Sequence, residues 1–270
     1  HGGFLCCPTW LPKKVGSLLE DDVDTVFNSA EAEEIRESIL DGSFKHCHHK
    51  LCPHIQNNSL PDKKDIIEKD EVLWNGGNVA DQRYKGLNPT FHNLCYDESC
   101  NLQCPSCRLN KIFYSEGPRY ERKMKIQNKI IKDLFLVPHD RSCVVNITGS
   151  GDPFASVIFR ELLFNVDGSK CPNVKINLQT NGVMFTPLYW QKMLKIQPNI
   201  NSVIISLDSG CEETYNKTRK GGNWVKLMEN LSFISELRKG NMINELRLDF
   251  VVQQLNYKEM PEFINIAKSI

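Results

Sequence analysis

SVIISLDSG, residues Ser202 to Gly210, is an apolar, β-branched run that ends in a short polar cluster with a glycine. Such a run is typical of a buried strand followed by a loop. The pattern occurs three more times, and each run is followed by a stretch with apolar residues at helical spacing. The other runs are VVNITGSGDPF (Val144–Phe154), VKINLQTNG (Val174–Gly182) and LRLDFVVQQLN (Leu246–Asn256). Strands alternating with helices in this way indicate βαβ units and a parallel sheet.

A further strand, at about residues 91–95, precedes a group of cysteines, and a long amphipathic helix at about residues 118–136 follows that group. The basic residues between Arg119 and Lys132 are interpreted as the solvated face of this helix. We therefore expect an α/β fold over residues 86–270, a partial TIM-like barrel of parallel strands with five βα units.

Polar residues gather where the predicted strands end, in TGSGDP, QTNG and SLDSG. Ligands of barrels and open parallel sheets bind at this C-terminal edge. Glycine, asparagine and aspartate also end strands simply as turn residues, and for a single loop we would favour that interpretation. Because three strand ends share the pattern beside a cysteine-rich loop, we favour one shared site.

The composition limits the partners and the cellular compartment that we expect for this chain. Lys+Arg and Asp+Glu are equal at 33 each, so the overall charge gives no reason to expect nucleic acid or an anionic membrane as partner. The most apolar runs are only as long as strands, so no transmembrane helix is expected. The chain opens at His1 without a basic and apolar leader, so no signal peptide is expected. Eleven cysteines, an odd number and clustered, favour metal binding over disulfides and a reducing cytoplasm over secretion.

The cysteine group CNLQCPSC places Cys100, Cys104 and Cys107 within eight positions. Four thiolates close a metal site, whereas three leave one coordination position open for chemistry. A cuboidal 4Fe–4S cluster normally takes four thiolates, so three would leave one iron free for a substrate or cofactor. A zinc site with Cys95 as the fourth ligand has an equally acceptable spacing and stays open as an alternative.

CNLQCPSC, placed after a first strand and before a helix, resembles the cysteine motif of the radical S-adenosylmethionine (SAM) superfamily. SGDP resembles the GGEP motif of that family, whose backbone receives the SAM amino group; an aspartate replaces the usual glutamate. TNG and SLDSG resemble the family's third and fourth strand endings. The resemblance also implies that a serine and an arginine hold the SAM carboxylate and that a fifth-strand valine lies near the adenine. The implied SAM-binding residues are Ser150, Gly151, Asp152, Pro153, Thr180, Asn181, Ser206, Asp208, Arg219 and Val252.

The resemblance implies reductive cleavage of SAM at the open iron to a 5′-deoxyadenosyl radical, which abstracts a hydrogen atom from a substrate. A carbohydrate or a peptide is the expected substrate class, and flavodoxin or ferredoxin the expected type of electron donor, in a cytoplasmic, reducing and anaerobic setting. Cys211, near the predicted mouth, is a candidate hydrogen-atom donor, with an idle or packed thiol as the alternative. Family cores usually contain six βα units, so a sixth is expected to be missing from this chain.

Two other functions stay open beside the enzyme. A zinc-stapled binding module would carry out no catalysis, and an electron-transfer or scaffold protein of the same ancestry would hold clusters without cleaving SAM. Metal content separates the first alternative from the enzyme, and a SAM cleavage assay separates the second.

Residues 1–55 contain two cysteine pairs on either side of a predicted helix, which should begin after Asn28 or Ser29 and end at Gly42. This segment resembles the SPASM or twitch modules that bind auxiliary iron–sulfur clusters in many radical SAM enzymes. The resemblance implies a second cluster, whose ligands would be Cys6, Cys7, Cys47 and Cys52. The histidines of HCHHKLCPH (His46–His54) keep zinc open as an alternative. The polar residues 56–85 are expected to form a linker.

Overall fold

The computed structural model describes residues 2–62, 89–147 and 150–270. The chain divides into two compact units, His1–Pro89 and Thr90–Ile270, and each is described by itself. The expected linker at residues 56–85 lies outside the described residues from position 63 onward. Within the described ranges, no helix is both long and apolar enough to cross a membrane.

The second unit is built on a five-stranded sheet whose strands pair in chain order and are all parallel to their neighbours. This confirms the predicted α/β fold with five βα units. Since β1 and β5 form the two edges, the sheet is an open, partial barrel in the part of the chain that the structure describes. The strands are β1 (Phe91–Leu94), β2 (Cys143–Ile147), β3 (Val174–Thr180), β4 (Ile200–Ser206) and β5 (Glu245–Asp249).

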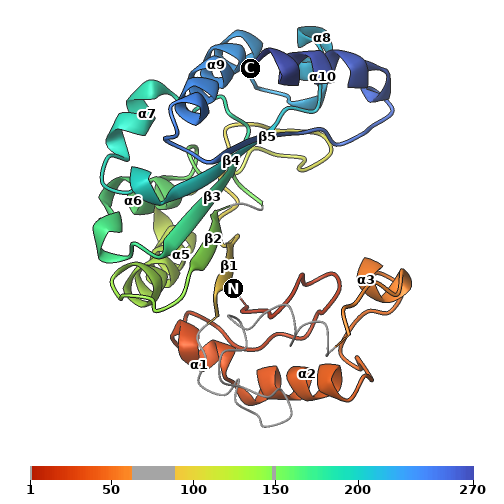
Figure 1. Cartoon of the computed structure of the whole chain (residues 1–270), viewed down its shortest axis with the longest axis vertical. Helices are drawn as coiled ribbons and strands as arrows, with labels where there is room; N and C mark the ends of the chain where they lie inside the picture. The colour runs from red at the N-terminus through yellow and green to blue at the C-terminus, as the bar shows by residue number, and fades with distance from the viewer. Residues whose placement is uncertain (1, 63–88, 148–149) are drawn as a thin grey trace. The chain divides into compact units, whose positions relative to one another are not determined.

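Helices α5, α6, α7 and α9 follow the outer side of the curved sheet (Figure 1). Alternate strand residues such as Val145, Ile176 and Val203 are fully buried, as are Ile158 of α6 and Leu231 of α9. The α-helices are α5 (Gly117–Ile130), α6 (Val157–Asn165), α7 (Pro187–Lys192), α8 (Glu212–Thr218), α9 (Trp224–Lys239) and α10 (Met260–Ser269). A π-helical turn, η2 (Ile131–Phe135), extends α5, and the 3₁₀ turns are η3 (Gly168–Lys170), η4 (Gln197–Asn199) and η5 (Tyr257–Glu259).

A row of asparagine side chains crosses the strands from β2 to the segment just before β5. Asn177 donates a hydrogen bond to Asn146 (2.8 Å) and accepts one from Asn201 (2.8 Å). Asn201 in turn accepts from Asn244 (3.0 Å). We call these four residues the asparagine ladder.

The last predicted strand is shorter than the sequence indicated. The predicted strand includes Val252, but β5 ends at Asp249. Beyond this point the Val251 N–H donates to the Asp208 carboxylate (2.7 Å), and the Asn256 side chain donates to the Asp208 carbonyl (2.8 Å). Val252, predicted to lie in the fifth strand, therefore follows the strand and is 59% exposed.

The first unit contains α1 (Val23–Phe27), α2 (Ala30–Leu40) and α3 (Pro53–Gln56). Ser29 caps α2, because its hydroxyl accepts the Ala32 N–H (3.2 Å), and Gly42 follows the helix with φ +77°, as the capping pattern predicted. An antiparallel bridge joins Gly3 to Gly16. Among residues 2–62, the buried apolar cluster of this unit consists of Leu11, Val15, Val26, Ala32 and Ile35.

Candidate functional site

The three motif cysteines lie in one loop beyond the end of β1. Cys100 and Cys104 are buried and pack together with Leu102, whereas Cys107 is exposed. The Cys107 N–H donates to the Cys104 carbonyl (2.9 Å), and the Cys100 N–H donates to the Ile112 carbonyl (2.9 Å), so the loop folds back on itself.

Nitrogen donors face all three sulfurs. Burial raises the pKa of the Cys100 thiol to about 11, and the neighbouring Asp152 carboxylate adds to the effect. Nearby donors are therefore needed to stabilise a thiolate there. The donors are the Leu102 N–H (3.4 Å) and Asn181 Nδ2 (3.8 Å) at Cys100, Arg219 Nη1 (3.8 Å) at Cys104, and Arg108 Nη2 (3.6 Å) at Cys107.

Arg108 joins the cysteine loop to the loop after β2. Its guanidinium donates to the Glu98 carbonyl (2.6 Å) and to the Ser150 carbonyl. Gly151 fits closely against the first loop, because a Cβ there would lie 2.5 Å from the Asp97 carbonyl oxygen. Only glycine allows the two backbones to approach this closely.

Asp152 connects this second loop to the end of β3. One carboxylate oxygen accepts the Thr180 hydroxyl (2.7 Å) and the Asn181 N–H (2.8 Å). The other accepts the Phe154 N–H (3.0 Å) and the Ala155 N–H (3.1 Å). The carboxylate is buried and accepts four hydrogen bonds from protein donors, so it ties the loop after β2 to the end of β3.

The loop after β4 holds Arg219 in place. Asp208 has φ +57°, a left-handed conformation that aspartate tolerates, and its carboxylate pairs with Arg219 at 2.6 Å. Burial raises the pKa of Asp208, and the Arg219 charge opposes that shift. The Arg219 Nε is buried and has no hydrogen-bond partner among the described residues. An unused cationic donor beside the thiols fits an anionic ligand.

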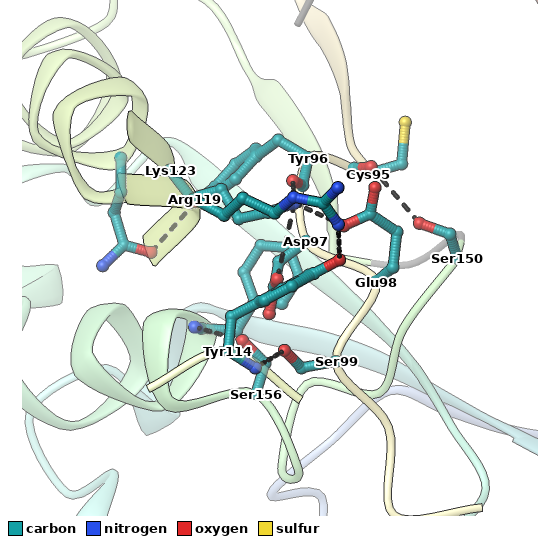
Figure 2. Close-up of polar contacts among 12 residues, drawn as sticks. Cys95, Tyr96, Asp97, Glu98, Ser99, Tyr114, Arg119, Lys123, Ser150 and Ser156 are labelled. Atoms are coloured by element: carbon teal, nitrogen blue, oxygen red, sulfur yellow. Dashed lines mark hydrogen bonds and ion pairs between the residues drawn. The ribbon is translucent and has the colours of Figure 1, made fainter. Parts of the chain in front are cut away.

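A buried lysine from α5 lies against the segment that leads into the cysteine loop (Figure 2). The Lys123 ammonium donates to the Tyr96 carbonyl and to Glu98, and lies 3.5 Å from the Asp97 carboxylate. Lys123 is only 2% exposed, so the prediction that the basic residues of this helix form a solvated face is wrong for this residue. Nothing in the sequence pattern distinguished it from its exposed neighbours.

The other predicted residues occupy varied positions. Ser206 is half-buried at the end of β4, and Pro153 is buried beside Asp152. Cys211 is exposed, and its thiol donates to Glu259 (3.4 Å). Cys95 is exposed and is not part of the buried cluster that contains Cys100 and Cys104.

Backbone hydrogen bonds link the segments that carry the two cysteine pairs of the first unit: the Trp10 N–H donates to the Cys7 carbonyl (2.9 Å), and the His48 N–H donates to the Trp10 carbonyl (2.6 Å). The pKa of Cys6 is raised by burial and also by the charges of Cys7 and Cys52, and that of Cys47 by burial and by the charges of Cys52 and Cys6. Charges act on one another in this way only when they lie close. Cys52 is buried and the other three cysteines are partly or fully exposed.

Two of the four histidines near Cys47 and Cys52 have other contacts, whereas the buried Nε2 of His46 has no hydrogen-bond partner among the described residues. His49 bonds to the Phe44 carbonyl (3.2 Å), and His54 bonds to Ser59 (3.3 Å) and packs edge-on against Trp10. Among the described residues, no three His, Cys, Asp or Glu side chains are arranged around the position of a single metal ion. Each thiolate of a cuboidal cluster binds a different iron, so cluster ligands lie further apart than the ligands of one ion.

Comparisons with known proteins identify the family of the chain. The family model described as the radical SAM superfamily matches residues 98–252, more than half of the chain. No curated protein matches. The solved structure of Streptococcus suis SuiB bound to S-adenosylmethionine is similar, with 17% sequence identity and a TM-score of 0.47. The similarity covers 88% of this chain and 50% of that chain, so the present chain spans about half the length of SuiB.

Proposed function

The chain belongs to the radical SAM superfamily of enzymes, and from this premise we propose that its second unit binds a 4Fe–4S cluster and SAM at the C-terminal edge of the sheet. One observation carries the proposal: each of three thiols in a single loop is faced by a nitrogen donor. Arg108 joins this loop to the loop after β2, Asn181 joins it to the end of β3, and Arg219, held by Asp208 from the loop after β4, contacts Cys104. When bound, the cluster would supply the electron for reductive cleavage of SAM, and SAM would supply the 5′-deoxyadenosyl group for hydrogen-atom abstraction from a substrate.

The protein's own residues bind and orient the reactants. Cys100, Cys104 and Cys107 would hold the cluster, with Arg108 and Arg219 offsetting its negative charge. The backbone at Ser150–Pro153 would receive the SAM amino group. Ser206 and Arg219 would hold the SAM carboxylate, and the unpaired Arg219 Nε supports that role. Val252 is proposed to contact the adenine, from the segment after β5 rather than from the strand.

The decisive experiment compares two cysteine variants after anaerobic reconstitution. We expect Cys104→Ala to abolish dithionite-driven cleavage of SAM, because one iron of the cluster loses its thiolate. Cys95→Ala is the matched control, since Cys95 is exposed and lies five residues before the motif. Cleavage that persists in Cys104→Ala would refute the proposal, whereas loss of metal in Cys95→Ala would favour the four-cysteine zinc site.

The two alternative functions are tested in the same preparations. A zinc-stapled binding module would be colourless and keep zinc in air, whereas the proposed enzyme would contain iron and sulfide. A scaffold protein would contain the cluster yet fail to cleave SAM with dithionite.

We propose further that the first unit holds an auxiliary iron–sulfur cluster on Cys6, Cys7, Cys47 and Cys52. Support comes from the backbone hydrogen bonds that link the two cysteine-bearing segments through Trp10, and from the other contacts of His49 and His54. We expect Cys47→Ala to lower the iron content without removing the iron held by the motif cysteines. Stoichiometric zinc in place of the lost iron would decide for the zinc alternative.

A carbohydrate or peptide remains the proposed substrate class, and family membership is its sole support. Incubation with uniformly deuterated sugars or peptides would transfer deuterium to 5′-deoxyadenosine only if the substrate is correct. Reduced flavodoxin or ferredoxin is proposed to replace dithionite in this assay. A reducing, cytoplasmic and anaerobic setting is also proposed, and loss of iron on exposure to air would test it.

A further inference from the structure

Tyr215, on α8, is a buried polar side chain that none of the roles above uses. Its side chain is fully buried, and its hydroxyl has no hydrogen-bond partner among the described residues. The ring packs edge-on against Trp224, with 5.4 Å between the ring centroids. A buried hydroxyl without a hydrogen-bond partner is destabilising. We therefore expect Tyr215 to have an acceptor for its hydroxyl hydrogen when the site is loaded.

The hydroxyl lies at the turn that covers the cysteine loop. A Cβ at Gly222 would lie 2.4 Å from the Tyr215 oxygen, so the glycine leaves room for it. In the same turn the Gln103 N–H, which precedes Cys104, donates to the Lys220 carbonyl (2.9 Å). The turn and the cysteine loop are therefore joined directly beside Tyr215.

Charged groups of the site act on this hydroxyl. Burial raises the pKa of Tyr215; the charge of Arg219 opposes the shift, and those of Cys104 and Asp152 add to it. Asp152 already accepts four hydrogen bonds from other groups, and Arg219 is a donor only. Of these three groups, Cys104 is thus the one that can accept a further hydrogen bond, and the Gln103–Lys220 hydrogen bond places its loop beside the turn against which Tyr215 packs.

We propose that the Tyr215 hydroxyl donates a hydrogen bond to the Cys104 sulfur when that sulfur is a cluster-bound thiolate. This inference rests on the proposed function, because the acceptor becomes strong only as a thiolate. Tyr215 is then a positioning residue that acts through Cys104. Hydrogen bonds to cluster sulfurs favour the reduced, more negative state and so raise the reduction potential.

The test replaces the hydroxyl alone. In the full-length, reconstituted protein we expect Tyr215→Phe to shift the cluster's midpoint potential to a more negative value, measured by EPR-monitored redox titration. Tyr189→Phe is the matched control, since that hydroxyl pairs with Arg160 (3.2 Å) on α6. An unchanged potential in Tyr215→Phe, or an equal shift in Tyr189→Phe, would overturn the proposal.

A second measurement separates this role from simple packing. In cluster-free protein, Tyr215→Phe should melt at the same or a higher temperature, because it removes an unpaired buried hydroxyl. In loaded protein it should speed the loss of iron to a chelator by roughly tenfold, as expected for a lost outer hydrogen bond. Equal iron retention by both proteins would refute the inference alone, whereas wild-type protein that holds no iron–sulfur cluster would refute the proposed function.

Discussion

Asp152 illustrates how one side chain sets the path of a loop at the residue scale. The motif that it resembles has glutamate at this position, yet here four donors surround the shorter carboxylate at 2.7–3.1 Å. We expect Asp152→Glu to lower the free energy of unfolding by about 1–3 kcal/mol, because the extra methylene must fit into a filled, buried site. Urea denaturation of cluster-free protein would measure this.

Asp152→Ala provides the comparison. It leaves four donors without their charged acceptor, so the loss should exceed that of Asp152→Glu and reach at least about 3 kcal/mol. A glutamate variant as stable as the wild type would show that the loop adapts to side-chain length and that the shorter residue is not required.

Two buried thiols should make the stability of the protein depend on pH. Cys143 and Cys171 are buried, and burial raises the pKa of each from 9.0 to about 11. Between these values the unfolded thiols release protons that the folded thiols retain. The free energy of unfolding should therefore fall as the pH rises from about 9 to about 11, on the order of 2 kcal/mol per thiol. Denaturant midpoints measured across this range would show the slope.

Alanine variants isolate the contribution of these thiols from other groups that titrate at high pH. Cys143→Ala and Cys171→Ala should each be less stable than the wild type at pH 8, because of the cavity, but should show a shallower decline. A decline as steep as that of the wild type would contradict the assignment.

At the scale of elements, α5 is tied to the cysteine loop by a buried ion pair. Lys123 and Asp97 are 2% and 0% exposed, and the Asp97 oxygens have no hydrogen-bond partner among the described residues (Figure 2). We expect Lys123→Met to lower the free energy of unfolding by about 3–5 kcal/mol, because it leaves the Asp97 carboxylate buried without a counter-charge. Chemical denaturation would measure the loss.

The double variant Lys123→Met/Asp97→Leu tests the reason for this loss. Removing both charges should recover much of the stability, since a buried pair replaced by apolar groups is often neutral. Losses that simply add would show that the two charges do not interact.

Elements with strong periodicity were predicted correctly, and their ends less so. The α/β class, the five strands and the capping of α2 all followed from local patterns. The end of β5 did not, because the Val251 N–H bonds to Asp208, which lies 43 residues away in the chain. An apolar run indicates that a segment is buried, but it does not show which residue far along the chain will accept a hydrogen bond from it.

The candidate site likewise contains residues that the sequence identified and residues that it did not. The thiol loop and the strand ends were recognisable because their residues are consecutive. Arg108, Lys123 and Tyr215 were missed as parts of the site, since each depends on a partner from another loop or strand end. The position of Arg108 directly after Cys107 was the one local signal available.

For the molecule as a whole, the two units should differ in their dependence on iron. Within residues 2–62, the apolar cluster of the first unit has five buried residues, a small core of the kind that a bound metal often supplements. We expect removal of iron by a chelator to increase hydrogen exchange across residues 2–62 while β2, β3 and β4 stay protected. Mass spectrometry of exchanged peptides would measure this.

Cys47→Ala should reproduce the effect without a chelator, while Cys95→Ala should not. If residues 2–62 keep their protection in iron-free protein, the first unit folds without its metal and the proposed auxiliary cluster has no structural role.

The asparagine ladder fixes the register between neighbouring strands. Apolar alternation forbids a slip of one residue between parallel strands but tolerates a slip of two, which moves a strand by roughly 7 Å. Such a slip would separate Asn177 from both Asn146 and Asn201. These amide hydrogen bonds therefore fix the register of β2, β3 and β4, so that the loops after these strands begin at the same edge of the sheet.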